Sequence, residues 1–189
     1  MKRYLIILVS PFLLFFLLPA FSLSNGSSNG TPVVSSKPQN PSAASPSSLR
    51  REILKKPGFY EIELLLPSGE EIKAVVTTTQ QGQRKGLSGV KPEEFGIDEG
   101  MFFQYPDSAF RSMWMPDTYM NLDIFFLDES LRVVEIVRDL PHHPGMEEPP
   151  PIPRTDTVYC RYVLEMRADS SLAEKIQRGE QLSTKGAMK

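Results

Sequence analysis

The residues best suited to binding chemistry lie in one segment, 113–128. It holds the only tryptophan of the chain, Trp114, followed by Met115, by the hydroxyl of Thr118 and by the carboxylate of Asp123. An aromatic face, a thioether and a few polar groups are what pockets for small polar ligands use. The segment therefore predicts a ligand-binding site made by these four side chains, with a small polar ligand or an extended peptide as partner.

Asp123 stands out because it interrupts an apolar strand pattern. Residues 122–127 place apolar side chains on both faces, so this strand should be central and buried. A buried ionised carboxylate needs a cation or several N–H donors; otherwise its pKa rises and it becomes neutral. We expect the partner to be Arg111, Arg84, Thr118 or nearby backbone amides, and Arg84 joins the predicted ligand-binding residues. A purely structural role for Asp123, in fastening a loop, stays open.

An enzymatic alternative uses the two carboxylates of Asp117 and Asp123. Paired carboxylates perform acid–base hydrolysis when their surroundings separate their pKa values. They are six positions apart, next to the bend at Pro116, so their separation in space is open. We expect a hydrolase only if the fold brings them together, and catalytic residues are otherwise unassigned. The third alternative is a purely structural module.

The histidines and the cysteine give weaker signals. His142 and His143 lie in a proline-rich loop, where adjacent imidazoles do not readily share one metal ion, so no metal site is expected. Cys160 alternates with its neighbours in a predicted strand, and as the only cysteine of the chain it is expected to be a small buried side chain. No cofactor motif is present, and no cofactor is expected.

The first 48 residues differ from the rest. Residues 1–22 join a short positive start to an apolar run, which is typical of a secretory signal peptide. The alternative is an uncleaved membrane anchor at 4–21, the one expected membrane contact. Residues 23–48 are rich in Ser, Pro, Asn and Gly and predict a disordered tether. Either way, residues 49–189 are expected to lie outside the cytoplasm, in the periplasm or secreted, as one globular domain.

Charge argues against nucleic acid as a partner. All 23 acidic residues lie after residue 48, and so do all but three of the 21 basic ones, Lys2, Arg3 and Lys37. The predicted domain 49–189 thus carries 18 positive and 23 negative side chains, a net charge of −5. A nucleic-acid-binding domain would present a basic patch or stripe instead.

The elements that must position these residues are mainly strands. The 17 prolines argue against a helical bundle, and the apolar runs are short and bounded by turn residues. The prediction is a mainly β fold, a compact sandwich or closed barrel with one or two short helices. Strands are expected at 59–66, 70–77, 100–105, 112–115, 122–127, 131–137 and 158–166, helices at 79–87 and 170–178, and an irregular loop at 141–153.

Several of these segments, in this order, resemble one known family. They are Arg84-Lys-Gly-Leu87, Gly100-Met-Phe-Phe-Gln-Tyr105, Met113-Trp-Met-Pro-Asp-Thr118, Asn121-Leu-Asp-Ile-Phe-Phe-Leu-Asp128 and Tyr162-Val-Leu-Glu-Met166. Together they resemble the domain-of-unknown-function family number 192, over about residues 71–182. The resemblance implies a compact β-sandwich or barrel, often behind an export signal. It implies no biochemical activity.

The chain departs from the family pattern in a few places. Ser88 follows Leu87 where the family has Met, and Pro116-Asp117 stands where Lys-Asn is usual. Arg167-Ala-Asp169 replaces Pro-Ala-Gly. Loss of the lysine removes a contact for phosphate or carboxylate, which weakens any anion-binding role carried over from the family.

Overall fold

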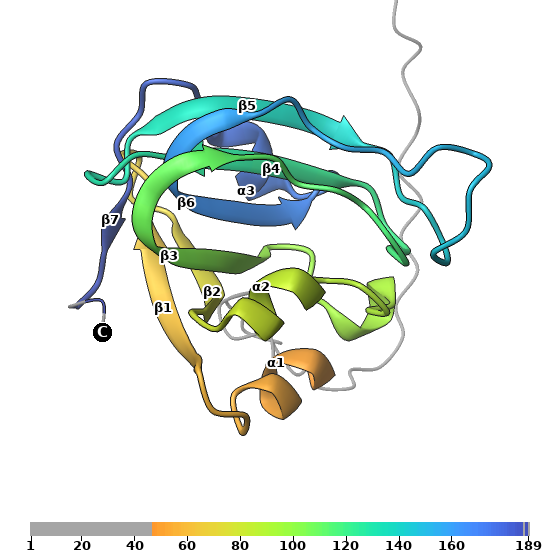
Figure 1. Cartoon of the computed structure of the whole chain (residues 1–189). Helices are drawn as coiled ribbons and strands as arrows, with labels where there is room; N and C mark the ends of the chain where they lie inside the picture. The colour runs from red at the N-terminus through yellow and green to blue at the C-terminus, as the bar shows by residue number, and fades with distance from the viewer. Residues whose placement is uncertain (1–46, 187, 189) are drawn as a thin grey trace, which may run out of the picture. The chain divides into compact units, whose positions relative to one another are not determined.

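The computed structural model describes residues 47–186 and 188 (Figure 1). The predicted signal at 1–22, its anchor alternative at 4–21 and almost all of the tether at 23–48 lie outside these residues and stay predictions. Within the described residues, the helices are too short and polar for any of them to cross a bilayer.

The described residues form one seven-stranded sheet in the order β5-β4-β6-β3-β2-β1-β7. Neighbouring strands run antiparallel, except for β2 and β3, which are parallel. The strands are β1 (Phe59–Leu65), β2 (Glu71–Thr77), β3 (Glu99–Arg111), β4 (Leu122–Leu127), β5 (Val133–Leu140), β6 (Val158–Arg167) and β7 (Ser183–Thr184).

The sheet curls into a half-barrel, as Figure 1 shows. The C-terminal segment contacts both of its edges. The Leu182 N–H donates to the Leu131 carbonyl at 3.0 Å and the Val133 N–H to the Glu180 carbonyl at 2.8 Å, beside β5. Directly after Leu182 the same segment becomes β7 and pairs with β1. The predicted mainly β class is confirmed.

Four of the predicted strands form two hairpins, β1 with β2 and β4 with β5. β1 and β2 are joined by a turn in which Gly69 has a φ of 96°, a value that glycine adopts without steric cost. In the turn between β4 and β5, the Asp128 carboxylate accepts the Ser130 hydroxyl at 2.7 Å and the N–H groups of Ser130 at 2.8 Å and Arg132 at 3.0 Å. Burial alone would raise the pKa of Asp128, but these bonds, that of the Ser130 hydroxyl first, hold it below its ordinary value.

Two strand predictions are wrong. β3 does not end at Pro106 but continues to Arg111, because its pairing with β6 shifts register between Gln104 and Ala109. A proline without an N–H is tolerated at such an irregularity. The strand predicted at 112–115 does not form, and only an isolated bridge between Trp114 and Arg154 is found there.

Both predicted helices form, although shorter than expected. α2 (Gln80–Lys85) begins at the Thr79 hydroxyl, which accepts the Gly82 N–H at 3.1 Å. α3 (Ser171–Lys175) begins in the same way at Ser170. The sequence analysis missed a third helix among the described residues, α1 (Ser48–Ile53), and one 3-10 turn at Pro92–Glu94. The expectation of one or two helices was therefore too low.

Buried side chains fill both faces of the sheet, as the pattern of β4 predicted. Every residue of β4 is buried. Phe125 and Leu127 belong to one apolar cluster, which also contains Ala173 of α3. Ile124 and Phe126 belong to a second cluster, which holds the candidate site at its margin.

Candidate functional site

Trp114 is held in place by a backbone ladder with a distant loop. The Met115 N–H donates to the Pro153 carbonyl at 3.0 Å, and the Thr155 N–H donates to the Met113 carbonyl at 2.8 Å. Side chains alternate along this short ladder, so Met113 and Met115 are buried while Trp114 is 47% exposed. The irregular loop predicted at 141–153 thus returns to fix the tryptophan that the sequence analysis singled out.

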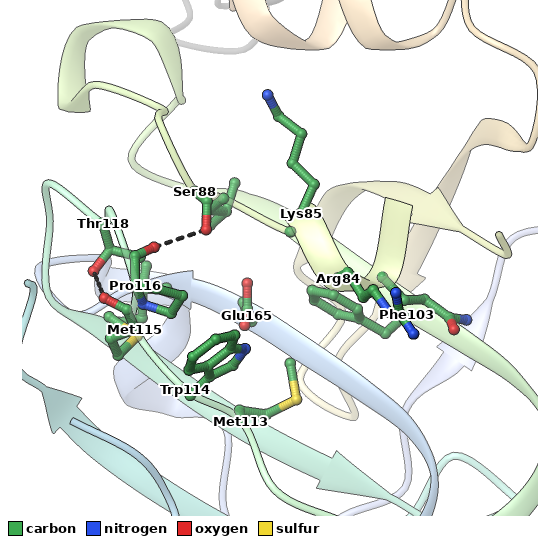
Figure 2. Close-up of a pocket in the computed structure, with 14 residues that line it drawn as sticks. Arg84, Lys85, Ser88, Phe103, Met113, Trp114, Met115, Pro116, Thr118 and Glu165 are labelled. Carbon is green, nitrogen blue, oxygen red and sulfur yellow. Dashed lines mark hydrogen bonds between the residues drawn. The ribbon is translucent and has the colours of Figure 1, made fainter. Parts of the chain in front are cut away.

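Thr118 supports this segment and has little hydrogen-bonding capacity left for a ligand. Its buried hydroxyl donates to the Met115 carbonyl at 2.9 Å and accepts the His143 N–H at 3.1 Å (Figure 2). One donor and one acceptor position of the hydroxyl are therefore already used. Thr118 fastens the loop at 141–153 against the Trp114 segment.

The end of α2 is attached to the same segment. Gly86, with a φ of 46°, ends the helix. The Ser88 hydroxyl then donates to the Pro116 carbonyl at 2.7 Å, and the Gly89 N–H donates to the Asp117 carbonyl at 2.7 Å (Figure 2). Ser88 and Pro116 are two of the positions where this chain departs from the family pattern, and here they contact each other.

Beside these attachments lies a cavity of about 20 Å³ next to Trp114 (Figure 2). A cavity of this size holds roughly one water molecule or another group of one heavy atom. Four of the predicted ligand-binding residues line it: Arg84, Trp114, Met115 and Thr118. The structure thus brings them together, while their role in binding stays a prediction.

Glu165 of β6 also lines this cavity, and the sequence analysis gave it no role. It is 4% exposed, and in Figure 2 its carboxyl lies beside Trp114, near Phe103. Burial alone raises the pKa of Glu165 from its ordinary value of 4.5 to about 8. The signal in the sequence is a single acidic residue inside the apolar run Val163-Leu-Glu-Met166.

Trp114 also lines a wider groove of about 550 Å³. Its polar wall includes Arg84 and Gln83 of α2, shared with the cavity, and Arg111 of β3. The Arg111 guanidinium stacks on the Tyr105 ring at 3.6 Å and bonds to Asp107 at 3.1 Å. Trp114 therefore lines both the cavity and the groove.

Asp123 does not belong to this site. It projects from the face of β4 that carries Phe125, opposite to the face of the cavity. Its carboxylate accepts from the Arg138 guanidinium at 2.6 Å and from the Asp139 N–H at 2.8 Å. The expected partners Arg111, Arg84 and Thr118 were wrong, because the Asp123 side chain faces β5 and the end of α3.

Asp117 lies in yet another network. Its carboxylate accepts from the Tyr119 hydroxyl at 2.7 Å and from the Gly145 N–H at 3.3 Å. Its φ of 51° is one that aspartate tolerates better than most residues. Asp117 and Asp123 thus have separate partners and no shared one.

The histidines also have separate partners. The His142 ring bonds to the Asn121 side chain at 2.6 Å, and the His143 ring bonds to the Glu147 carbonyl at 2.9 Å. Across residues 47–186 and 188, no three His, Cys, Asp or Glu side chains gather as a metal site would require. Cys160 is buried, as predicted, and burial raises the pKa of its thiol to about 11.

Two solved structures are similar to this chain. A candidate transcription regulator from Sinorhizobium meliloti 1021 is 22% identical, with a TM-score of 0.53 over 68% of this chain and 97% of its own. A protein of unknown function from Novosphingobium aromaticivorans DSM 12444 is 24% identical, with a TM-score of 0.52 over 66% of this chain and 84% of its own. At these identities the likeness shows the fold alone.

A comparison with curated proteins finds no match. A family model does match, over residues 64–184, which is most of the described sheet together with every residue that lines the cavity and the groove. That model is the one described as "Uncharacterized ACR". This chain belongs to the domain-of-unknown-function family number 192, DUF192.

Proposed function

We propose that this protein is a binding module that takes a small polar ligand or a peptide segment at Trp114. The observation that carries the proposal is the position of Trp114, 47% exposed and lining both the cavity and the groove. The other large apolar side chains exposed in the described residues are Ile97, Phe110, Met146 and Tyr159. None of these four lines the cavity or the groove, so Trp114 alone combines an exposed aromatic face with a concave surface.

The cations around Trp114 supply polar recognition. Arg84 and Lys85 are exposed on α2, and no hydrogen bond or ion pair with another described residue engages either side chain. The Arg154 guanidinium lies 5.9 Å from the Trp114 ring on another side. An aromatic face with guanidinium and ammonium groups nearby suits a ligand with a flat or apolar part and an anionic or carbonyl end.

The proposal is tested by thermal shift and calorimetry on the full chain with metabolites, sugars and short peptides. We expect at least one compound to raise the melting temperature, and we expect Trp114→Ala to abolish that shift. Tyr159→Ala is the matched control, because Tyr159 is an aromatic residue with 57% exposure that lines neither the cavity nor the groove. A shift that survives in Trp114→Ala would contradict the proposal.

A hydrolase that uses Asp117 and Asp123 would need them to act together, but each carboxylate is bound in its own network. A purely structural role fits Thr118 and Asp123, whose side chains fasten backbone segments. It does not explain an exposed tryptophan that lines a cavity. Nucleic-acid binding, suggested by the name of the Sinorhizobium protein, is disfavoured by the net charge of −5 over residues 49–189.

We infer in addition that the domain acts outside the cytoplasm. The support is the apolar run that follows a positive start in residues 1–22 and the polar stretch at 23–48. Fractionation of the producing cells, with N-terminal sequencing of the mature chain, tests this. A new N-terminus near residue 22 supports export with cleavage, an intact chain in the membrane fraction supports an anchor at 4–21, and an intact chain in the cytoplasm contradicts both.

We also infer that the curled sheet works as a closed barrel. The support is the C-terminal segment, which bonds to residues 131–133 beside β5 and then, as β7, to β1. Amide hydrogen exchange tests this. Protection of the Leu182 and Val133 N–H groups equal to that of the central strands supports closure, and rapid exchange at both would contradict it.

A further inference from the structure

From the cavity beside Trp114 we infer a subsite for a primary ammonium group, with Glu165 as its counter-ion. The inference rests on the proposed function and specifies which part of the ligand enters the cavity. A free amino acid and the amino terminus of a peptide carry the same group, and the experiment below separates these two sources.

The Glu165 carboxyl is buried and has no partner among the described residues. Glu165 is 4% exposed, and no hydrogen bond or ion pair with another described residue reaches its carboxyl. Buried carboxyl groups in folded proteins are normally hydrogen-bonded or paired, because an unmet one costs free energy. An unpaired carboxyl that lines a cavity is therefore available to bind a polar or charged group of a ligand.

The size and the lining of the cavity indicate which ligand group it accepts. A cavity of about 20 Å³ admits a group of one heavy atom, such as an ammonium. An ammonium brings three donors and a full charge, which a hydroxyl does not, so it compensates a buried carboxylate better. The adjacent ring of Trp114 adds the attraction of its π face for a cation.

The charges at the rim favour a ligand that also has an acceptor. Arg84 and Lys85 of α2 line the same cavity. Neither cation forms an ion pair with Glu165, so the Glu165 carboxyl has no charge partner among the described residues. An amino acid or peptide terminus places a carboxylate or a carbonyl next to its ammonium, and Arg84 or Lys85 can bind that group.

Binding of the ammonium group is coupled to the protonation state of Glu165. Below its pKa the Glu165 carboxyl carries a proton, and pairing with an ammonium requires the carboxylate. Binding therefore releases one proton from Glu165 to solvent. Affinity for a permanently charged alkylammonium should then tighten by about tenfold per pH unit as the pH rises toward the Glu165 pKa and level off above it.

The test is calorimetry on the full chain with four probes: methylammonium, alanine, trialanine and N-acetyl-trialanine. We expect binding of amine probes with proton release, and a loss of about tenfold or more for the acetylated peptide, which lacks the charged donor. Tighter binding of alanine than of trialanine indicates that the ligand is a free amino acid. Tighter binding of trialanine indicates a peptide terminus. Glu165→Gln keeps the side-chain shape and should lose both the affinity and the proton release.

Two outcomes would overturn the inference, and they differ. If N-acetyl-trialanine binds as tightly as trialanine, or if Glu165→Gln binds the amines unchanged, the ammonium subsite is wrong while the binding site at Trp114 stands. If none of the four probes binds to the wild-type chain, the ammonium subsite fails. In that case a positive result in the metabolite and sugar screen preserves the proposed function, and a negative one removes it as well. Glu70→Gln, on an exposed ion pair with Lys175, is the matched control.

Discussion

The Arg138 guanidinium joins the Asp123 carboxylate to the end of α3. One of its nitrogens donates to Asp123 at 2.6 Å and to the Ala173 carbonyl at 2.8 Å, and the other donates to the Ile176 carbonyl at 2.5 Å. A cation at the last carbonyls of a helix satisfies groups that otherwise lack partners. Asp123 thus connects β4, β5 and α3 on the face of the sheet away from Trp114.

Asp123→Asn should therefore lower the free energy of unfolding and leave ligand binding unchanged. The amide keeps the shape but removes the charge opposite Arg138, at a cost of about 2 kcal/mol, because the guanidinium is 37% exposed and partly screened by solvent. Urea denaturation measures the loss, and calorimetry checks binding. A variant of normal stability that has lost binding would place Asp123 in the site after all.

Glu165 gives stability a dependence on pH. Its pKa is about 8 in the folded chain and near the ordinary 4.5 in the unfolded chain. Between these values the folded state holds one more proton than the unfolded state. The free energy of unfolding is therefore at its full value below pH 4.5 and falls by about 1.4 kcal/mol per unit as the pH rises toward 8. Denaturation of wild type and Glu165→Gln at several pH values measures this, and equal slopes in the two proteins would contradict it.

Thr77 offers a stabilising substitution. Its hydroxyl is fully buried and has no hydrogen-bond partner among the described residues. Thr77→Val removes the unmet group and keeps the branched shape, so stability should rise by about 1 kcal/mol. Gly82→Ala is the contrasting variant, because its added Cβ would lie 2.2 Å from that hydroxyl. In thermal unfolding, Thr77→Val should melt above the wild type and Gly82→Ala below it. A much lower melting temperature for Thr77→Val would contradict the absence of a partner for the Thr77 hydroxyl.

Cys160 should not react in the folded protein. It is 1% exposed, and burial raises the pKa of its thiol to about 11, so little thiolate forms near pH 8. An aromatic disulfide reagent at pH 8 should label the chain only after denaturant is added. Rapid stoichiometric labelling without denaturant would contradict the buried placement.

Four of the five residues predicted to bind a ligand line one cavity. Alternating apolar residues and turn residues predicted the strands of both hairpins, because these signals are local. The convergence of Arg84, Trp114, Met115 and Thr118 depends on backbone bonds to residues 153–155 and 143, far along the chain. No local sequence pattern predicts such long-range hydrogen bonds.

The errors share one physical cause. Arg138 was not considered as the partner of Asp123, because their contact depends on the register of β4 against β5, which includes two irregularities. Glu165 was missed because its position at the cavity depends on contacts of β6 with segments far along the chain. Pro106 was read as a strand end because the irregularity that accommodates it lies in the pairing with β6.

The central claim, that Trp114 and Glu165 form one binding site, is tested most directly on the indole N–H signal of Trp114. The chain has one tryptophan, so a nitrogen–proton NMR spectrum contains one such signal. Titration with trialanine should move it saturably in the wild type, and the movement should disappear in Glu165→Gln. An indole signal that moves equally in both proteins, or in neither, would contradict the account.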